Sequence, residues 1–342
     1  MKKRILFLGA CAAVLLLLQE LLVPKYMESS REGALTGEYY ANAGGNDVIF
    51  VGDCEVYENF SPITLWEEYG ITSYIRGSAQ QTIWQSCYLL EETFAYETPE
   101  VVVFNVLAMK YDTPESTGSA SKREAYNRMT LDTMRWSGAK WDAIVASMTE
   151  DESIFTYLFP ILRYHDRWSQ LTEEDAAYWF HKETVSDNGY LMQTGVKPYT
   201  TPYTQPPLAD DAFGENSWYY LDRMVQLCRA HGTQLVLVKA PSQYPVWWEQ
   251  WDAQIRDYAE ANGLLYVNML DHQAQIGIDW DTDTYDAGLH LNVYGAEKAA
   301  AWFGRILSEE CGVPDRREEE AFAARWAEKV KRYDERKKEC LE

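Results

Sequence analysis

Asp47-Val48-Ile49-Phe50-Val51-Gly52-Asp53-Cys54 (residues 47–54) is the most informative stretch of this 342-residue chain. An unbroken apolar run rich in β-branched side chains is typical of a strand that is buried on both faces, as in a parallel sheet. Similar runs recur at residues 101–104, 235–238 and 264–267, and a weaker one lies at 73–75. The sequence therefore predicts several buried parallel strands.

Helical patterns lie between these runs, at residues 80–94, 217–231, 247–261 and 292–309. Strands that alternate with helices of this length indicate βαβ crossovers and a doubly wound sheet. We therefore predict a three-layer α/β/α sandwich, spanning residues 47–312, with a mostly parallel, flavodoxin-like central sheet.

The alternation breaks down between residues 111 and 216. This stretch contains helical pieces at 141–148 and 153–164, followed by a segment rich in Pro and Tyr. Long excursions from a compact domain are usually functional or disordered, and we predict an inserted helical cap over the sheet. The tail, residues 313–342, is dense in Glu, Lys and Arg, and it is predicted to be a solvated, charged helix.

The N-terminus begins Met1-Lys2-Lys3-Arg4 and continues with an apolar run to Val23. A basic flank before a run of this length favours an uncleaved signal anchor over residues 1–24, followed by a juxtamembrane spacer at 25–46. The alternatives are a cleaved signal peptide and a lipoprotein anchor at Cys11. The positive-inside rule then places the domain on the extracellular face of a bacterial-type cell surface.

Charge and cysteine content exclude several classes of partner. The net charge of −22 repels phosphate backbones, so nucleic acid is not an expected partner. The six cysteines show no paired spacing, and the histidines have no companion ligands, so no metal and no cofactor are expected. One or two disulfides remain an alternative, and a Cys54–Cys87 bridge would block Cys54.

Ligands of open α/β sheets bind at the carboxyl ends of the strands, so the residues that directly follow the predicted strands are the candidates for a site. The first strand is followed by Asp53, Cys54 and Glu55. The second runs into Arg76-Gly77-Ser78 and the third into Asn105, and a late loop, residues 285–292, precedes the last helix of the sandwich.

In this order and position, Val51-Gly52-Asp53-Cys54 and Asp286-Ala287-Gly288-Leu289-His290-Leu291-Asn292 resemble the motifs of the SGNH/GDSL hydrolases. The resemblance spans residues 47–110 and 233–309. It implies that Cys54 stands in the position of the serine nucleophile, with His290 as its base and Asp286 orienting the imidazole. It also implies an oxyanion hole made by the backbone N–H of Gly77, the side-chain amide of Asn105 and the backbone N–H of Cys54.

Two departures from the family pattern leave alternatives open. Three residues separate Asp286 from His290 where the family usually has two, so Asp283 is a second candidate for the orienting acid. Cysteine replaces serine, so Cys54 is either an acyl-transferring nucleophile, part of a degenerate site that only binds, or a structural cysteine. The adjacent Glu55 disfavours a thiolate. For His290 the alternative is a loop histidine that only bonds backbone.

Further candidates for substrate binding are Asp53, Glu55 and Arg76 at the strand ends, and Arg163 and His165 in the insertion. For the last two, a surface cluster neutralised by neighbouring acids is the favoured alternative. Trp247 and Trp251 are spaced for core packing, with sugar stacking as the alternative. A weak calcium site at residues 279–283 is an alternative to a solvated loop there.

The resemblance implies a membrane-anchored hydrolase or acyltransferase that acts on O-acyl groups, O-acetyl above all, of cell-envelope or secreted glycans, or on a small acyl ester. The alternative is a catalytically inactive glycan-binding or scaffold protein of surface-polysaccharide machinery. Family likeness, not the site itself, carries the glycan assignment.

Overall fold

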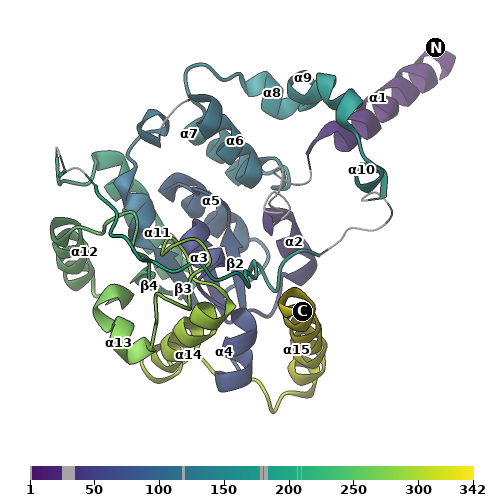
Figure 1. Cartoon of the computed structure of the whole chain (residues 1–342). Coiled ribbons are helices and arrows are strands. Elements are labelled where there is room, and N and C mark those ends of the chain that lie inside the picture. The colour runs from purple at the N-terminus through teal and green to yellow at the C-terminus, as the bar shows by residue number, and fades with distance from the viewer. Residues whose placement is uncertain are drawn as a thin grey trace.

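Five parallel strands form the centre of the protein in this computed structural model (Figure 1), which describes residues 2–24, 35–117, 120–177, 180, 184–205, 207–208 and 210–342. The strands are β1 (Val48–Gly52), β2 (Ser73–Gly77), β3 (Val101–Asn105), β4 (Gln234–Lys239) and β5 (Leu265–Asn268). Their order is β2-β1-β3-β4-β5, and every neighbouring pair is parallel. The predicted flavodoxin-like sheet is confirmed.

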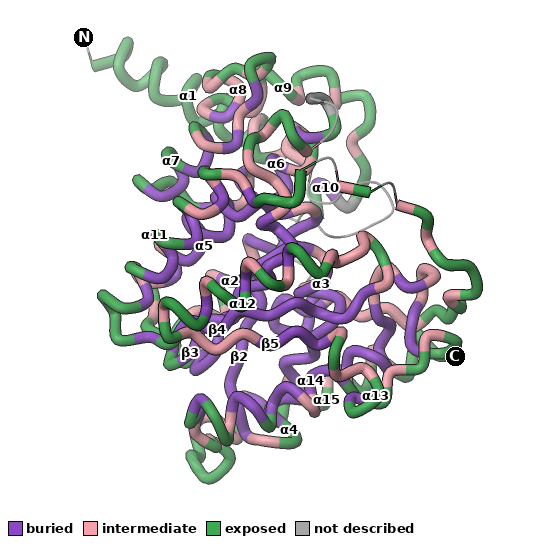
Figure 2. Tube along the Cα trace, turned by 90° about the vertical axis from the view of Figure 1, so that its left-hand side faces the viewer, coloured by how far each residue is buried: buried purple, intermediate pink, exposed green. Residues whose placement is uncertain are grey.

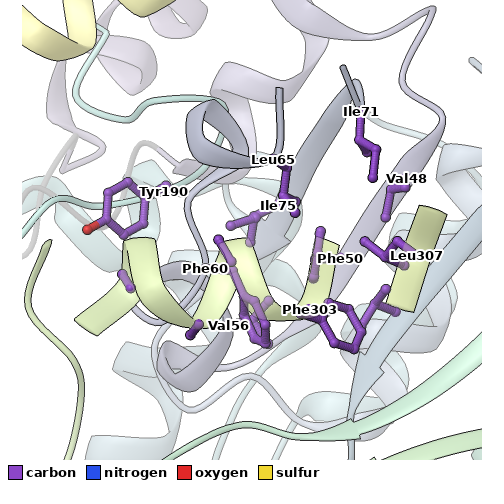
Figure 3. Close-up of a cluster of buried hydrophobic side chains, with 14 of the residues drawn as sticks. Val48, Phe50, Val56, Phe60, Leu65, Ile71, Ile75, Tyr190, Phe303 and Leu307 are labelled. Atoms are coloured by element: carbon purple, nitrogen blue, oxygen red, sulfur yellow. The ribbon is translucent and has the colours of Figure 1, made fainter. Parts of the chain in front are cut away.

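Alternate residues of the buried strands contribute side chains to two separate hydrophobic cores, one on each face of the sheet. Val48 and Phe50 point into the first core, whereas Ile49 and Val51 point into the second. In the first core, Phe50 and Phe60 pack with their ring centroids 5.1 Å apart, and Phe303 lies beside both (Figure 3). Because a strand places successive side chains on opposite faces, a continuous apolar run is what a sheet covered on both sides requires.

Helices cover both faces of the sheet, which confirms the three-layer arrangement. The first core is covered by α3 (Cys54–Tyr57), α4 (Pro62–Tyr69), α13 (Gln273–Ile276), α14 (Val293–Glu309) and α15 (Glu320–Leu341). The second core is covered by α5 (Ile83–Thr93), α7 (Gly138–Ser147), α11 (Glu215–His231) and α12 (Glu249–Asn262). A short 3₁₀ segment, η5 (Met269–His272), follows β5.

The part of the predicted spacer that the structure describes belongs to the domain. Residues 35–42 form helix α2 (Leu35–Asn42), which packs against β2. Tyr39 is fully buried, and the guanidinium of Arg76 lies 4.0 Å from the centre of its ring. The packed domain therefore includes α2, N-terminal to the expected start at residue 47, while residues 25–34 of the spacer lie outside the described residues.

The insertion consists of two parts with different positions. It begins after η2 (Val106–Lys110). Its helical part contains η3 (Pro114–Thr117), α6 (Ala120–Leu131), α7, α8 (Ile154–Leu158), α9 (Ile161–Tyr164), η4 (His165–Gln170) and α10 (Glu173–Ala177). Helix α7 packs on α5 and thickens one helical layer. The extended part begins at residue 184 and first runs alongside β2. It then crosses the carboxyl edge of the sheet, where Leu191 N donates to Tyr57 O at 2.8 Å and Lys197 N donates to Thr284 O at 2.9 Å. The extended part, more than the helices, therefore borders the strand ends.

The charged tail forms a helix, as predicted, but one of its faces is buried. Trp326 is fully buried in α15 and stacks on Trp66 of α4 with ring centroids 5.1 Å apart. Tyr333 donates a hydrogen bond to Glu297 of α14 at 2.7 Å. The expectation of a solvated helix therefore holds for the charged face, and the aromatic residues make the tail part of the domain.

Helix α1 (Lys2–Leu22) projects from the body of the protein and is exposed along most of its length (Figures 1 and 2). Its mean hydropathy is 2.4, and among the described residues it is the one helix long and apolar enough to cross a membrane. Such a helix serves either as a membrane anchor or as a signal sequence.

Candidate active site

Cys54 lies at the carboxyl end of β1, an inner strand between β2 and β3, as the first residue of the one-turn helix α3. Asp53 caps this helix by accepting a hydrogen bond from the backbone N–H of Glu55 at 3.2 Å. Cys54 is partly exposed, yet burial raises the pKa of its thiol. The charge of His290 offsets this effect only in part, and the carboxylates of Asp53 and Glu58 add to it. The resting group is therefore a thiol that needs a base.

His290 reaches Cys54 from the loop before α14 and is oriented by Asp286. Its Nδ1 lies 2.7 Å from Asp286 Oδ2, and its backbone N–H donates to Asp286 Oδ1 at 2.9 Å. Because a carboxylate only accepts, Nδ1 carries the proton, and Nε2 is the nitrogen left for the hydrogen bond between His290 and Cys54. The structure thus brings the three predicted residues together in the order that nucleophilic catalysis needs.

Asp286, and not Asp283, is the acid that contacts the imidazole. Asp283 is buried, and its Oδ2 accepts hydrogen bonds from Lys298 Nζ at 2.6 Å and from the backbone N–H of Asp279 at 2.8 Å. It therefore anchors the start of the loop. Burial raises the pKa of Asp286, but the hydrogen bonds with His290 outweigh it and leave the pKa below its ordinary value.

The extra residue between Asp286 and His290 forms a bulge in the loop. Ala287 and Gly288 both have positive φ, 66° and 93°, and Gly288 N donates to the Thr284 hydroxyl at 2.8 Å. The bulge brings the i and i+4 residues Asp286 and His290 into contact across it. A spacing of three residues is therefore compatible with the pairing.

Glu58 is a second carboxylate at His290 that sequence reasoning missed. Its Oε2 lies 3.1 Å from His290 Nδ1, and its carboxylate accepts the Tyr285 hydroxyl at 2.9 Å. Burial by itself lowers the pKa of His290, but Cys54, Glu58 and the hydrogen bond with Asp286 raise it well above the ordinary value. Glu58 lies one helical turn after Cys54, which is the one sequence signal that could have identified it.

The raised pKa of His290 predicts activity that rises with pH. A general base must be neutral to accept the thiol proton, so turnover increases as pH rises through the pKa of His290. Glu58→Gln removes one carboxylate and lowers that pKa, so the acid limb of kcat/KM against pH should move to lower pH by roughly one unit. The measurement is a pH–rate profile of both proteins.

Glu328→Gln, the same charge change on the exposed face of α15, is the matched control and should leave the profile in place. An acid limb that stays put, or moves to higher pH, in Glu58→Gln would show that Glu58 does not tune His290.

Asn59 holds the loops of the site together and was also missed. Its Nδ2 donates to the Pro241 carbonyl at 2.8 Å, and its Oδ1 accepts the backbone N–H of Leu291 at 2.8 Å. One buried side chain thereby joins the segment after α3, the loop after β4 and the residue next to His290. Nothing in its sequence context distinguishes it from other asparagines.

A buried charged network lies beneath Cys54. Glu55 is paired with Lys239, the last residue of β4, through Nζ–Oε distances of 3.0 and 2.8 Å. Both side chains are almost completely buried. Burial and the neighbouring Glu55 raise the pKa of Asp53. Asp53 and Glu55, proposed from the sequence as substrate contacts, are instead buried supports of the nucleophile turn.

Two of the three positions expected in the oxyanion hole, Asn105 and Gly77, differ from expectation in detail. The Asn105 amide donates to Asp53 at 3.2 Å and to Glu55 at 3.0 Å, so both of its hydrogens are directed at carboxylates. Gly77 ends β2 opposite Gly52, and an added Cβ would lie 3.1 Å from the Gly52 carbonyl oxygen. Strand packing therefore explains the need for glycine at position 77. The Asn105 amide must turn away from the two carboxylates before it can bind an oxyanion.

Lys110, the last residue of η2, is a further cation near the nucleophile. Burial lowers its pKa, but the charges of Tyr111, Asp53 and Glu55 and that of Cys54 outweigh burial, so the pKa is raised. Lys110 therefore stays protonated and offers positive charge close to Cys54. A lysine at the end of an apolar run, five residues after Asn105, gives no sequence signal for this position.

Three of the substrate-binding candidates lie elsewhere, and for Arg163 the ion pair with Glu124 agrees with the favoured alternative of a neutralised surface cluster. Arg76 is buried and points away from Cys54, with its guanidinium on Glu92 at 2.6 Å and on the Leu89 carbonyl at 2.7 Å. Arg163 pairs with Glu124, and His165 bonds the Leu162 carbonyl, in α9 and η4 beside α1. Strand alternation explains Arg76, because the residue before Gly77 faces the α5 side of the sheet.

Three further alternatives from the sequence concern the cysteines, the tryptophans and the acidic loop. All six cysteines are free, so the Cys54–Cys87 bridge is absent. Trp251 is buried, and Trp247 packs on it with ring centroids 5.5 Å apart, as the core interpretation required. Among the described residues, no group of three or more His, Cys, Asp or Glu side chains is placed to hold a metal ion, and this includes residues 279–283.

Comparisons with known proteins give a likeness in solved structures alone. No family model matches the chain, and no curated protein matches it. A crystal structure described as an acylhydrolase, from Bacteroides fragilis, has 13% identity and a TM-score of 0.40, with coverage of 80% of this chain and 95% of the other. A GDSL-like lipase from Bacteroides thetaiotaomicron has 13% identity and a TM-score of 0.39, with coverage of 81% and 98%. The functional proposal therefore rests on the residues of this chain.

Proposed function

We propose that the chain is an SGNH-type hydrolase or acyltransferase that moves O-acyl groups, O-acetyl above all, through a Cys54–His290–Asp286 triad. The observation that carries this proposal is the position of His290. Its Nδ1 is held by Asp286 at 2.7 Å, and its ring interacts with the Cys54 thiol at the carboxyl edge of the sheet. A base oriented by an acid and bonded to a nucleophile is the arrangement expected for covalent acyl transfer.

The residues can carry out a balanced two-step reaction. His290 Nε2 takes the proton from the Cys54 thiol, and the sulfur attacks the ester carbonyl to form a tetrahedral oxyanion. The C–O bond to the alcohol then breaks, His290 returns the proton to the leaving oxygen, and a thioester remains on Cys54. Water or a sugar hydroxyl, deprotonated by the same imidazole, resolves the thioester and frees the sulfur.

The proposed substrate class follows from the expected location. An N-terminal helix that anchors the domain outside the membrane would place the site among envelope or secreted glycans, whose O-acyl esters are accessible there. Lys110 and the backbone around Cys54 supply positive potential for the oxyanion in this proposal.

A catalytically silent glycan-binding or scaffold protein is the second candidate. It is favoured by the Asn105 amide, which is engaged by two carboxylates, and by the raised pKa of Cys54. Both features weaken acyl transfer without weakening binding. In that case Cys54 would be dispensable for ligand binding.

The experiment that separates the two is labelling with an ester-directed, acylating activity probe, followed by peptide mapping. The enzyme proposal expects one adduct, on Cys54, and turnover of a small aryl acetate. If the folded wild-type protein neither reacts with the probe nor hydrolyses any ester, the enzyme proposal fails. Glycan binding that survives in Cys54→Ala would then support the second candidate.

A further inference from the structure

We propose that three tyrosines beside the Asp286–His290 loop form a binding surface for a sugar ring of the acylated substrate. We call Tyr199, Tyr203 and Tyr244 the tyrosine row. This inference rests on the proposed function and specifies how its glycan would be held.

The tyrosine row is a continuous aromatic surface built from two distant segments. Tyr199 and Tyr203 come from the extended part of the insertion and stack with ring centroids 5.7 Å apart. Tyr244 comes from the loop after β4, and its ring lies 4.9 Å from that of Tyr203. Tyr244 is 39% exposed, and the other two are half-buried, so ring surface stays open to solvent.

The row is fixed to the bulge between Asp286 and His290. The Tyr203 hydroxyl donates to the Ala287 carbonyl at 3.0 Å, and Ala287 N donates to the Lys197 carbonyl at 3.0 Å. A Cβ on Gly288 would come within 3.2 Å of the Tyr199 ring. The extra residue between Asp286 and His290 thus belongs to the bulge against which the tyrosine row packs.

The row also lies within electrostatic reach of the triad. Burial and Asp286 raise the pKa of the Tyr203 hydroxyl, and His290 lowers it. A substrate ring on this surface would therefore be near the carbonyl that Cys54 attacks. Aromatic rings with hydroxyls at their edges bind the C–H faces of pyranoses and leave the sugar hydroxyls free to form hydrogen bonds. A small aryl ester has no sugar ring and does not need this surface.

The test compares two substrates in the full chain. For Tyr244→Ala, the ratio of kcat/KM for a 6-O-acetylated N-acetylglucosamine tetramer to kcat/KM for phenyl acetate should fall about tenfold. Tyr244→Trp, which keeps an aromatic face, should retain most of the ratio. The control is Tyr219→Ala on α11, a 58% exposed tyrosine outside the row, which should leave the ratio unchanged.

A ratio that stays constant in Tyr244→Ala would overturn the inference. A second measurement separates this failure from failure of the proposed enzyme: binding of the tetramer without acetyl groups to Cys54→Ala, followed by NMR. Weaker binding after Tyr244→Ala in that background supports the row even if the protein turns over no ester, and unchanged binding rejects it.

A separate observation carries a second inference, about the base of α1. We infer that one face of α8, α9 and η4 lies on the lipid surface of the membrane into which α1 inserts. We call Phe155, Phe159, Leu162 and Trp168 the interfacial patch. These side chains are 59%, 53%, 53% and 71% exposed.

The patch lies beside the end of α1. Helix α1 packs against α9, η4 and α10. Figure 1 shows α9 and α10 near α1. Arg167 Nη1 donates to the Leu22 carbonyl at 3.2 Å and pairs with Asp175 at 2.8 Å. The apolar run that forms α1 ends at Val23, one residue after the helix, so its lipid boundary falls at this level.

The composition of the patch fits lipid headgroups and upper acyl chains. Aromatic side chains are enriched at the membrane–water boundary, and short amphipathic helices bury apolar faces there. Four large apolar side chains exposed together are otherwise unusual on a soluble surface. The interfacial patch would therefore contact the same bilayer that α1 would cross.

The test reconstitutes the full chain in nanodiscs that contain a lipid with a photoreactive diazirine in its upper acyl chain. Crosslinks should map to residues 154–168 as well as to α1, and Phe155→Ser/Phe159→Ser/Leu162→Ser/Trp168→Ser should lose the former and keep the latter. The exposed Tyr219 segment of α11 is the internal control. Crosslinks confined to α1 in the wild-type protein would contradict the inference.

Discussion

Cys54→Ala is expected to lower kcat/KM for an aryl acetate by at least about three orders of magnitude while the protein stays folded. The reason is that the thioester cannot form without the sulfur, so the reaction falls back on what the oxyanion donors and substrate binding supply alone. The side chain is small and only partly buried, so truncation to alanine removes little packing. Steady-state kinetics of the wild type and of Cys54→Ala measure the loss of kcat/KM, and thermal melts of both proteins check that the variant is folded.

His290→Ala should fall to the same level, because nucleophile and base act as one unit and their losses do not add. The double variant should be no slower than either single one. Cys54→Ser keeps the shape and should retain part of the activity, since a hydroxyl can use the same base. Wild-type rates in Cys54→Ala would remove the thioester mechanism.

Lys239→Met is expected to give the largest loss of stability, about 3–5 kcal/mol in the free energy of unfolding. The variant leaves Glu55 buried beneath the site without its cation, next to a buried Asp53. Removing one partner of a buried pair costs far more than the pair itself contributes, because an unpaired buried charge remains. A melting temperature lower by roughly 10 °C is the expected readout.

Lys338→Met is the matched control, since Lys338 and Glu342 are 3.8 Å apart and largely exposed, and the change should be almost neutral. Adding Glu55→Leu to Lys239→Met should recover part of the lost stability by removing the stranded charge. A Lys239→Met protein as stable as the wild type would show that the network under Cys54 is not a structural pair.

The sheet could be predicted because its signal is local and repeated. Val48 to Val51 and the similar runs contain the β-branched and aromatic residues that a strand covered on both faces needs, and the helices between them fix parallel connections. The same logic placed Cys54, Asn105 and the loop of His290 at one edge. The structure brings those segments together there.

The supporting residues could not be predicted, because their roles depend on partners far away in sequence. Glu58 contacts His290 across 232 positions of chain, and Glu55 contacts Lys239 across 184. From sequence alone, a charged residue after a strand is equally compatible with a substrate contact and with one half of a buried ion pair. For Glu55, only the position of Lys239 decides between the two. Arg76 was misplaced for the same reason, because its partner Glu92 lies on α5.

The extent of the domain was underestimated where aromatic residues lie among polar ones. Tyr39 and Trp326 are surrounded by residues typical of a spacer and of a solvated helix, yet both are fully buried. A single large ring buries enough area to dock a short amphipathic helix, whereas the average composition of the segment hides it.

Intact-protein mass spectrometry during turnover of an acetyl ester tests whether the sulfur carries the acyl group. Rapid acid quenching should trap a fraction of the wild-type protein with one added acetyl group, mapped to Cys54 and released by hydroxylamine, and Cys54→Ala should show none. An acetyl group on another residue, or the same adduct in Cys54→Ala, would contradict the account.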